Sequence, residues 1–262
     1  MFDSHSRLAI PGESHFIVTM ARARQRYERP GGPVARAFLD DVLASERFQK
    51  WQLPDAAVRQ ALADSEPACL ADAIRTLFGA YAAHRGKPLY GDKTPGYVRN
   101  VPVLAELFPE ARFVHIVRDG RDVALSLKEM DWARRQAPDG VETLAGFWRT
   151  NIELAFEARE ELGPQCYHEI HYERLIDDPE RVLRDVCAFL ELPYEPAMLS
   201  YHERSDELAA SLRNRDDHRH IRLAPTRGLR DWRTQMPPAD VSRFELVAGE
   251  VLDRAGYPRA TR

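Results

Sequence analysis

The sequence predicts an α/β fold built on a parallel sheet. Three short apolar segments are typical of strands, at 88–91, 112–117 and 165–172. Stretches with helical periodicity separate each of these segments from the next. Such alternation favours parallel pairing, because the chain must cross back over the sheet between parallel strands.

Helical periodicity dominates the rest of the 262-residue chain. Apolar side chains recur every three or four residues in several segments, which predicts helices with one buried face. These segments are 34–51, 68–84, 144–156 and 244–255. Gly256 follows the last of them, at a position where a glycine commonly ends a helix. We expect a single domain over residues 1–262, with ample chain for a core.

Composition argues against several classes of protein. The formal net charge of −4 gives no broad basic field, so nucleic acid is not an expected partner. No apolar run approaches the roughly 20 residues that a membrane-spanning helix needs. The cysteines, Cys69, Cys166 and Cys187, are widely spaced and odd in number. That pattern fits neither a disulfide framework nor a zinc site and favours the cytoplasm.

The segment "GKPLYGDKTPG" (86–96) is close to a Walker A phosphate loop, but its chemistry differs. Pro88 has no N–H to donate to a phosphate, and the residues after it are typical of a strand. Asp92 moves Lys93 out of register and adds a carboxylate where phosphates would lie. The segment therefore predicts a strand with Lys93 at its carboxyl end, where ligands bind in open α/β sheets.

The segment "RFVHIVRDGRDVALSLKEM" (112–130) predicts a largely buried strand, a turn and a helix. Asp119 can cap that helix, and Val123, Leu127 and Met130 form its inner face. Arg118 stands between the strand and the helix N-terminus, a position suited to an anion that the hydroxyl of Ser126 could also contact. An ion pair of Arg118 with Asp119 or Asp122 is the alternative.

The segments "DKTPGYV" and "LAELFPEARFVHIVRDGRDVALS" together resemble the sulfotransferases that use 3′-phosphoadenosine 5′-phosphosulfate (PAPS), above all the bacterial and tyrosylprotein branch. The resemblance implies that Arg118 and Ser126 hold the 3′-phosphate of the donor and that Lys93 lies beside the transferring sulfuryl group. It also implies a P-loop-NTPase-like three-layer sandwich, with a short central parallel sheet and many helices.

Later segments resemble the same family in the same order. "HYERLIDDPERVL" implies that Tyr172 contacts the adenine-containing half of the donor, and "YHERSDEL" implies a place for Ser205 near the reacting centre. "TRGLRDWR" resembles the segment that closes over the 3′-phosphate, which implies roles for Arg227, Gly228 and Arg230.

The first residues resemble the end of the family's first helix and the loop after it. In "FDSHSRLAIPGESHFI" (2–17), Glu13 occupies the place of the family's catalytic base; a carboxylate at a helix start is the alternative. The family's first strand and its "RSGTT" loop, which binds the 5′-phosphosulfate, have no counterpart in this sequence. Two explanations are open: an N-terminally incomplete domain, which we favour, and a member of the family that binds without catalysis.

We therefore expect a sulfuryl transfer from PAPS to a hydroxyl or amine, with Glu13, Lys93 and Ser205 at the reacting centre. The alternatives are an inactive, nucleotide-binding relative and a P-loop kinase. No metal is expected, because His168 and His171 point to opposite faces of their strand and no other cluster has ligand spacing. A small molecule, carbohydrate, lipid or peptide can be the acceptor, and a homodimer is compatible with the sequence.

Overall fold

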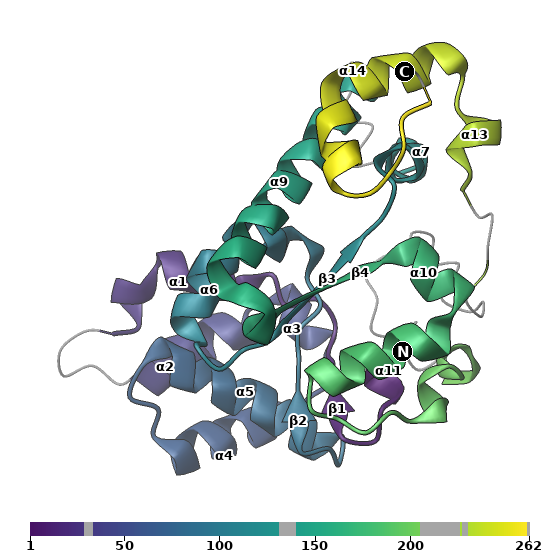
Figure 1. Cartoon of the computed structure of the whole chain (residues 1–262). Coiled ribbons are helices and arrows are strands. Elements are labelled where there is room, and N and C mark those ends of the chain that lie inside the picture. The colour runs from purple at the N-terminus through teal and green to yellow at the C-terminus, as the bar shows by residue number, and fades with distance from the viewer. Residues whose placement is uncertain (29–33, 131–139, 205–225, 227–229, 261–262) are drawn as a thin grey trace. The chain divides into compact units, whose positions relative to one another are not determined.

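The computed structural model describes residues 1–28, 34–130, 140–204, 226 and 230–260 (Figure 1). The chain forms two compact units. Unit 1 comprises Met1–Glu110 and Glu195–Ala224, and unit 2 comprises Ala111–Tyr194 and Pro225–Arg262.

Unit 1 is mostly helical, with two very short strands. Its α-helices and strands are β1 (Leu8–Ala9), α1 (Phe16–Arg22), α2 (Val34–Leu43), α3 (Glu46–Gln49), α4 (Asp55–Ser65), α5 (Leu70–His84), β2 (Leu89–Tyr90) and α6 (Val101–Leu107). Its 3-10 turns are η1 (Phe2–Ser4), η2 (Arg24–Arg26), η3 (Pro95–Asn100), η4 (Pro196–Met198) and η5 (Tyr201–Arg204).

The helix predicted over 34–51 is interrupted in the structure. It divides into α2 and α3, and the Ser45 side chain between them accepts a hydrogen bond from the N–H of Phe48. Helices α2, α4 and α5 then pack side by side (Figure 1). Trp51 follows α3 and meets Phe78 and Tyr81 of α5, with ring centroids 4.8 and 5.5 Å apart. The break therefore lets a second apolar face reach the core of unit 1.

The strands of unit 1 run parallel, with Leu8 paired to Leu89 and Ala9 to Tyr90. The strand predicted at 88–91 is confirmed as β2. Strand β1 differs from the expected helix end and loop over residues 2–17, where the helical residues are those of η1 and the first two of α1. Two residues are too few to produce a recognisable alternation of apolar and polar side chains, so β1 leaves no sequence signal.

Unit 2 holds the longer strands and the longest helix. Its elements are β3 (Phe113–Val117), α7 (Gly120–Lys128), α9 (Val141–Cys166), β4 (Tyr167–His171), α10 (Tyr172–Asp177), α11 (Pro179–Phe189), α13 (Trp232–Gln235) and α14 (Pro238–Arg254). Strands β3 and β4 pair in parallel from Phe113–Tyr167 to Val117–His171, as their spacing predicts. The expectation that β3 is largely buried is wrong: only Val117 is buried, Ile116 is 50% exposed and the other three residues are partly exposed, since a two-stranded sheet covers its side chains less than a wide one does.

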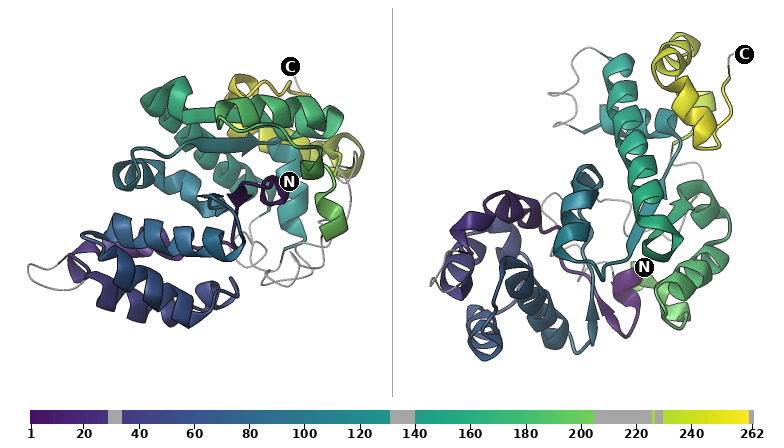
Figure 2. Two further views of the ribbon diagram at one scale, coloured as in Figure 1. Left: turned by 90° about the horizontal axis from the view of Figure 1, so that it is seen from below. Right: turned by 60° about the vertical axis from the view of Figure 1, so that its left-hand side comes forward.

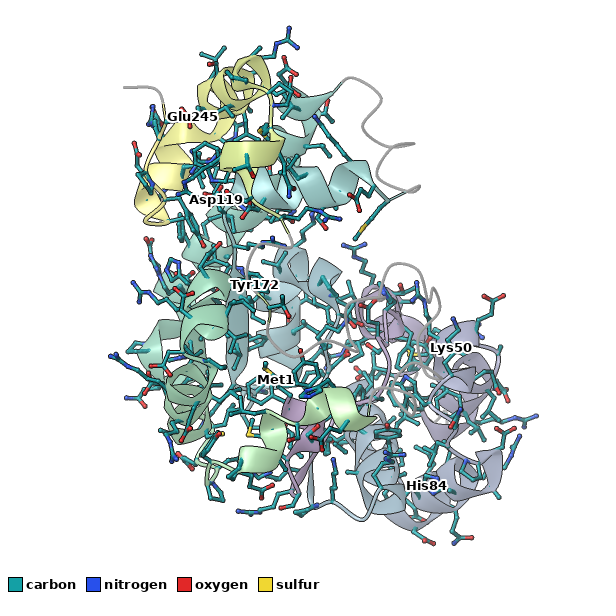
Figure 3. The ribbon with its side chains drawn as sticks, turned by 90° about the vertical axis from the view of Figure 1, so that its right-hand side faces the viewer. Met1, Lys50, His84, Asp119, Tyr172 and Glu245 are labelled. Atoms are coloured by element: carbon teal, nitrogen blue, oxygen red, sulfur yellow. The ribbon has the colours of Figure 1, made fainter. Side chains whose placement is uncertain are left out.

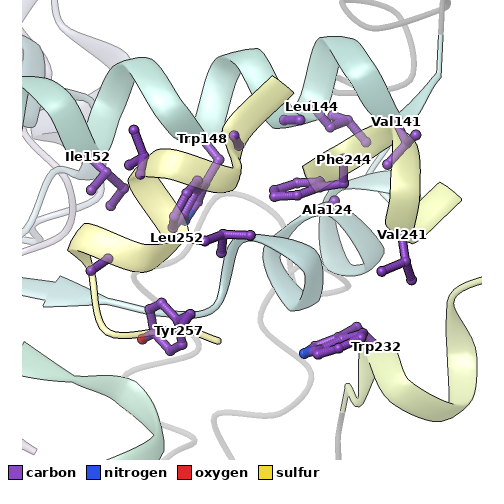
Figure 4. Close-up of a cluster of buried hydrophobic side chains, with 14 of the residues drawn as sticks. Ala124, Val141, Leu144, Trp148, Ile152, Trp232, Val241, Phe244, Leu252 and Tyr257 are labelled. Atoms are coloured by element: carbon purple, nitrogen blue, oxygen red, sulfur yellow. The ribbon is translucent and has the colours of Figure 1, made fainter. Parts of the chain in front are cut away.

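The core of unit 2 forms where α9, α14 and α7 pack together (Figures 2 and 4). Trp148 of α9 and Phe244 of α14 lie at its centre, with ring centroids 6.0 Å apart. Gly120 begins α7 directly beneath them. A Cβ atom at Gly120 would lie 2.5 Å from Trp148 and 2.7 Å from Phe244, so only glycine allows this approach.

The end of α14 confirms the predicted role of Gly256. This residue has a φ of 80°, in the left-handed region that favours glycine. The N–H of Tyr257 donates to the carbonyl of Leu252, and the N–H of Gly256 donates to that of Asp253. These two bonds form a Schellman motif, which turns the chain back and brings Tyr257 into the core of unit 2.

Candidate functional site

Glu13 and Lys93, the predicted base and the predicted sulfuryl contact, form an ion pair within unit 1. Lys93 Nζ lies 2.5 Å from Glu13 Oε1. Each residue follows a strand of the same parallel pair, Glu13 after β1 and Lys93 after β2. The carboxyl ends of parallel strands meet at one edge of a sheet, which explains how residues 80 positions apart come together. The alternative role of Glu13 at a helix start is wrong, because α1 begins after His15.

Two more nitrogen-bearing side chains, an imidazole and a guanidinium, lie close to Glu13. His15 Nε2 is 2.8 Å from Glu13 Oε2, and Arg47 Nη1 is 4.0 Å from the same oxygen. Burial raises the pKa of Glu13, but the hydrogen bonds and charges of Lys93 and His15 outweigh it, and the pKa is lowered. Glu13 is therefore ionised at neutral pH, the state in which a carboxylate can accept a proton.

A buried hydrogen-bond chain holds the two site segments together. Ser14 Oγ donates to Asp92 Oδ2, and Thr94 Oγ1 donates to Asp92 Oδ1 at 3.0 Å. The N–H of Ser14 donates to Thr94 Oγ1 at 3.2 Å. The hydroxyl of Tyr97 lies 2.8 Å from Ser14 Oγ and accepts from the N–H of Ile17 at 3.1 Å. The hydroxyls of Ser14 and Thr94 both donate to Asp92, so an ionised Asp92 carboxylate, which only accepts, completes this set of hydrogen bonds.

This set of hydrogen bonds fixes the positions of Glu13 and Lys93. Ser14 is the neighbour of Glu13, while Asp92 and Thr94 are the two neighbours of Lys93. Bonds from Ser14 to both neighbours prevent the two segments from sliding past each other. Burial raises the pKa of Asp92, and hydrogen bonds from Ser14 and Thr94 counteract part of that effect. Sequence reasoning treated Asp92 only as an obstacle to phosphate, because its partner lies 78 residues away.

Arg118 stands at the end of β3 in unit 2, as predicted. Its guanidinium lies over the ring of Tyr172, 4.6 Å from the centroid, and 3.9 Å from Asp122. Its carbonyl accepts a hydrogen bond from Trp148 Nε1 at 3.1 Å. The Nε atom of Arg118 is buried and has no hydrogen-bond partner among the described residues. The stacked, incompletely bonded guanidinium is suited to receive an anionic ligand.

The neighbours of Arg118 and Tyr172 are also bonded to each other. Asp119 follows Arg118, and its N–H donates to Oε1 of Glu173 at 3.0 Å, while Glu173 itself follows Tyr172. The other carboxylate oxygen of Glu173 accepts from the hydroxyl of Tyr257 at 2.8 Å. Glu173 therefore links the ends of β3 and β4 to the segment after α14.

Arg121 is the most buried charged residue of this region and was not singled out by sequence reasoning. It donates to both carboxylate oxygens of Asp119, at 3.0 and 2.7 Å, and to Glu245 of α14 at 2.7 Å. Figure 3 labels the two acceptors, Asp119 and Glu245, in unit 2. The indole of Trp232 lies against its guanidinium, 3.6 Å from Cζ to the ring. Asp119 also caps α7 by accepting from the N–H of Arg121, as predicted. Asp119 is thereby occupied by Arg121, and Arg118 pairs with Asp122 instead.

Ser126 and Arg230 complete the described part of the predicted donor site. Ser126 lies on α7 four residues after Asp122 and so on the same face of the helix as that residue, which is 3.9 Å from the Arg118 guanidinium. Arg230 forms an ion pair with Glu129, at the end of the same helix. Ser205, Arg227 and Gly228 lie outside the described residues. The structure thus brings Glu13 to Lys93 and Arg118 to Tyr172.

In the described segments, no helix is long and apolar enough to cross a membrane. Within the same residues, no group of three or more histidine, cysteine, aspartate or glutamate side chains has the geometry of a metal site.

Comparison with known proteins places this geometry in a family. The sequence profile of the sulfotransferase family matches residues 1–196. Two solved sulfotransferase domains share the fold: one from the curacin biosynthetic pathway (TM-score 0.63, 21% identity, 98% of this chain and 91% of that one) and one from the Synechococcus PCC 7002 olefin synthase (TM-score 0.66, 21% identity, 97% and 87%). The α/β fold is that of sulfotransferases, and the chain belongs to the sulfotransferase family.

Two curated relatives indicate the range of the family. Protein-tyrosine sulfotransferase 1 of Danio rerio is 25% identical over 98% of this chain and 67% of its own length. Omega-hydroxy-beta-dihydromenaquinone-9 sulfotransferase Stf3 of Mycobacterium tuberculosis is 30% identical over 64% of this chain and 41% of its own length. The chain therefore spans about two thirds of the first relative and less than half of the second.

Proposed function

We propose that the protein transfers a sulfuryl group from PAPS to a hydroxyl, or an amine, of an acceptor. Membership of the sulfotransferase family supports sulfuryl transfer. The observation that carries the proposal is the Glu13–Lys93 pair, a base and a cation 2.5 Å apart at the carboxyl end of a parallel strand pair.

In the proposed step, Glu13 is the general base. The acceptor oxygen attacks the sulfur in line as its O–H proton passes to Glu13, and a new O–S bond forms. The S–O bond to the leaving phosphate breaks, and adenosine 3′,5′-bisphosphate departs with the electron pair. A positioned base contributes about 10²–10⁴-fold to such a step.

Lys93 stabilises the charge that develops on the oxygen of the leaving group. To do so, its ammonium leaves Glu13 Oε1 and turns to the donor. The Lys93 side chain is 55% exposed and flexible enough for this movement. The same movement frees Oε1 for the acceptor hydroxyl, so donor binding and activation of the base are coupled.

The 3′-phosphate of the donor would be held by residues at the end of β3 and on α7. The Nε of Arg118, which has no partner in the described part of the chain, and the hydroxyl of Ser126 would bind the 3′-phosphate. Tyr172 would contact the adenine-containing half. Arg227, Gly228 and Arg230 would close over the phosphate, and Ser205 would lie near the sulfuryl group. The position of the Arg118 guanidinium over the Tyr172 ring supports this assignment, because the ring orients the guanidinium before any ligand arrives.

The names of the relatives specify a protein tyrosine and a hydroxylated menaquinone, both of which offer a hydroxyl. We propose a hydroxyl acceptor, on a peptide, lipid, carbohydrate or small molecule. The three cysteines are free thiols, which supports a reducing compartment such as the cytoplasm.

Two measurements test the proposal. Calorimetry should show saturable binding of adenosine 3′,5′-bisphosphate, with ATP as the control that a P-loop kinase would prefer. Incubation with ³⁵S-labelled PAPS and a panel of hydroxyl acceptors should give a labelled product. Binding without turnover would instead favour a non-catalytic nucleotide-binding protein, and preference for ATP would overturn the assignment of the donor.

A further inference from the structure

Tyr257 bonds to both neighbours of Tyr172, the ring over which the Arg118 guanidinium lies. Its hydroxyl donates to Oε2 of Glu173 at 2.8 Å, and Nδ1 of His171 lies 3.2 Å from the same hydroxyl. A phenol has a single proton, so that proton goes to Glu173 and the Tyr257 oxygen accepts from the Nδ1–H of His171. The residues immediately before and after Tyr172 are thus held by the same group.

The start of α10 depends on these bonds because it has no side-chain cap of its own. Helix α10 begins at Tyr172, and His171, the residue before it, makes no side-chain hydrogen bond to the helix. The imidazole of His171 contacts Tyr257 instead, with ring centroids 5.6 Å apart. A helix of 6 residues is too short to hold its first turn by itself. The direction of the Tyr172 side chain is therefore set by contacts from outside α10.

The hydroxyl of Tyr257 has a fixed position, because the segment after α14 is bonded at several places. Tyr257 is 8% exposed and belongs to the core of unit 2 (Figure 4). The carbonyl of Pro258 accepts from Nη2 of Arg121 at 3.0 Å, and the N–H of Ala260 donates to Glu245 at 2.8 Å. The segment cannot move away from α7 and α14 without breaking these bonds.

The same segment is linked to Arg118 through Asp119, the next residue in the sequence. The N–H of Asp119 donates to Glu173, and its carboxylate accepts from Arg121. Glu173 in turn accepts from Tyr257, and Arg121 donates to the carbonyl of the residue after Tyr257. The segment after α14 therefore contacts two of the residues that bond Asp119.

We propose that Tyr257 is a positioning residue of the donor site, which holds Tyr172 under the Arg118 guanidinium through its bonds to His171 and Glu173. The inference rests on the proposed function, in which Arg118 binds the 3′-phosphate and Tyr172 contacts the adenine-containing half. Burial raises the pKa of Tyr257, and the charge of Glu173 raises it further, so the hydroxyl keeps the proton that it donates.

Loss of this hydroxyl should weaken donor binding and leave the chemical step unchanged. Without it, Tyr172 can leave the Arg118 guanidinium, and the affinity decreases in proportion to the fraction of molecules that keep the binding arrangement. Once the donor is bound, that arrangement is restored and the reacting groups act as before. The expected signature is a higher KM for PAPS with an unchanged kcat, which a general loss of folded protein would not produce.

Tyr257→Phe removes the hydroxyl but keeps the ring in the core, and Tyr167→Phe is the matched control. Tyr167 begins β4 in the same unit and is 5% exposed, and its buried hydroxyl has no hydrogen-bond partner among the described residues. In Tyr257→Phe we expect the Kd for adenosine 3′,5′-bisphosphate, measured by calorimetry, and the KM for PAPS to rise about fivefold, the effect of a lost hydrogen bond. Both values should stay at the wild-type level in Tyr167→Phe.

A double-mutant cycle separates action through Glu173 from a general loosening of the core. Tyr257→Phe should lower the affinity for adenosine 3′,5′-bisphosphate less in a Glu173→Ala background than in the wild type, because the acceptor of the hydroxyl is already absent. An equal loss in both backgrounds, an unchanged affinity in Tyr257→Phe or the same loss in Tyr167→Phe would each overturn the inference. Urea unfolding checks that every variant is folded under the assay conditions.

The proposed function and the role of Tyr257 fail in different ways. A wild-type protein that does not bind adenosine 3′,5′-bisphosphate would contradict the proposed function. A wild type that binds it, together with a Tyr257→Phe variant that binds it equally well, would contradict the role of Tyr257 alone.

Discussion

Asp119 and Glu173 are joined by a hydrogen bond of 3.0 Å from the N–H of Asp119 to Oε1 of Glu173. The bond lies between the ends of β3 and β4, and the residue before each partner is a predicted donor contact. Arg118 precedes Asp119, and Tyr172 precedes Glu173. In unit 1, Ser14 and Asp92 are likewise bonded to each other, and Ser14 follows Glu13 while Asp92 precedes Lys93. In both units, therefore, neighbours of the site residues are bonded and hold the site in place.

Glu173→Ala tests this principle in unit 2. The substitution removes the acceptor for both Asp119 and Tyr257, so Arg118 and Tyr172 lose their fixed alignment. The loss of one or two hydrogen bonds, each contributing about 1 kcal/mol, corresponds to an affinity for adenosine 3′,5′-bisphosphate roughly five- to thirtyfold lower. Calorimetry measures the change.

The controls are Glu173→Gln and Glu180→Ala. Glutamine still accepts from the N–H of Asp119 and should keep most of the affinity, whereas Glu180 is bonded to the exposed Arg184 on α11 and should matter little. If Glu173→Ala bound the bisphosphate as tightly as the wild type, Glu173 would have no role in positioning.

Local sequence patterns account for much of the scaffold. The segment 112–130 is read correctly as strand, turn and helix because each step has a local cause: an apolar run, the cap Asp119 and an apolar face on α7. Gly256 likewise has a local cause, since only a left-handed residue can end α14 as it does. The roles of Glu13, Lys93 and Arg118 are those that the family resemblance implies. The positions of Lys93 and Arg118, each just after the carboxyl end of a predicted strand, are confirmed.

Long-range contacts are the part that the sequence does not reveal. Ser14 and Asp92 lie 78 positions apart, and nothing near either residue indicates the other. Arg121 resembles an ordinary surface arginine in sequence, but Glu245, 124 positions later, makes it a buried ion pair. His15 was overlooked for a different reason. Its contact with Glu13 is made from a left-handed backbone conformation, which composition does not reveal.

Glu13 and Lys93 should be needed for the chemical step but not for holding the donor. We expect Glu13→Ala and Lys93→Ala each to lower kcat for sulfuryl transfer by at least about 10²-fold, because each removes a group that acts on the reacting atoms. Affinity for adenosine 3′,5′-bisphosphate should stay nearly intact. Radiolabel transfer and calorimetry on the same preparations separate the two effects, and full activity in either variant would remove that residue from the mechanism.

Asp92 should make stability depend on pH in a defined direction. Burial raises its pKa in the folded protein above the unfolded value of about 3.9. A raised folded pKa means that the folded state holds the proton more tightly, so this contribution is complete below the unfolded pKa and is lost as pH rises through the folded pKa. The free energy of unfolding of the wild type minus that of Asp92→Asn should therefore decrease as pH rises from about 4 toward neutral.

Urea denaturation at several pH values measures that difference, and subtraction of the Asp92→Asn curve cancels the other titrating groups. Above the folded pKa the difference should become constant. A difference that instead grows with pH would mean that the hydrogen bonds from Ser14 and Thr94 outweigh burial and that Asp92 is ionised more readily in the folded protein than in the unfolded chain.

Two glycine-to-alanine substitutions should change stability in opposite directions. At Gly120 the new Cβ would lie 2.5 Å from Trp148 and 2.7 Å from Phe244, so Gly120→Ala should destabilise the protein by about 1–3 kcal/mol through overpacking. Gly146 lies inside α9, and a methyl group added there would have no described atom within 4 Å beyond its own helix backbone and chain neighbours. Gly146→Ala should therefore stabilise the protein by about 0.5–1 kcal/mol through helix propensity. Urea unfolding measures both, and equal effects of the same sign would contradict the close packing of Gly120 against the core of unit 2.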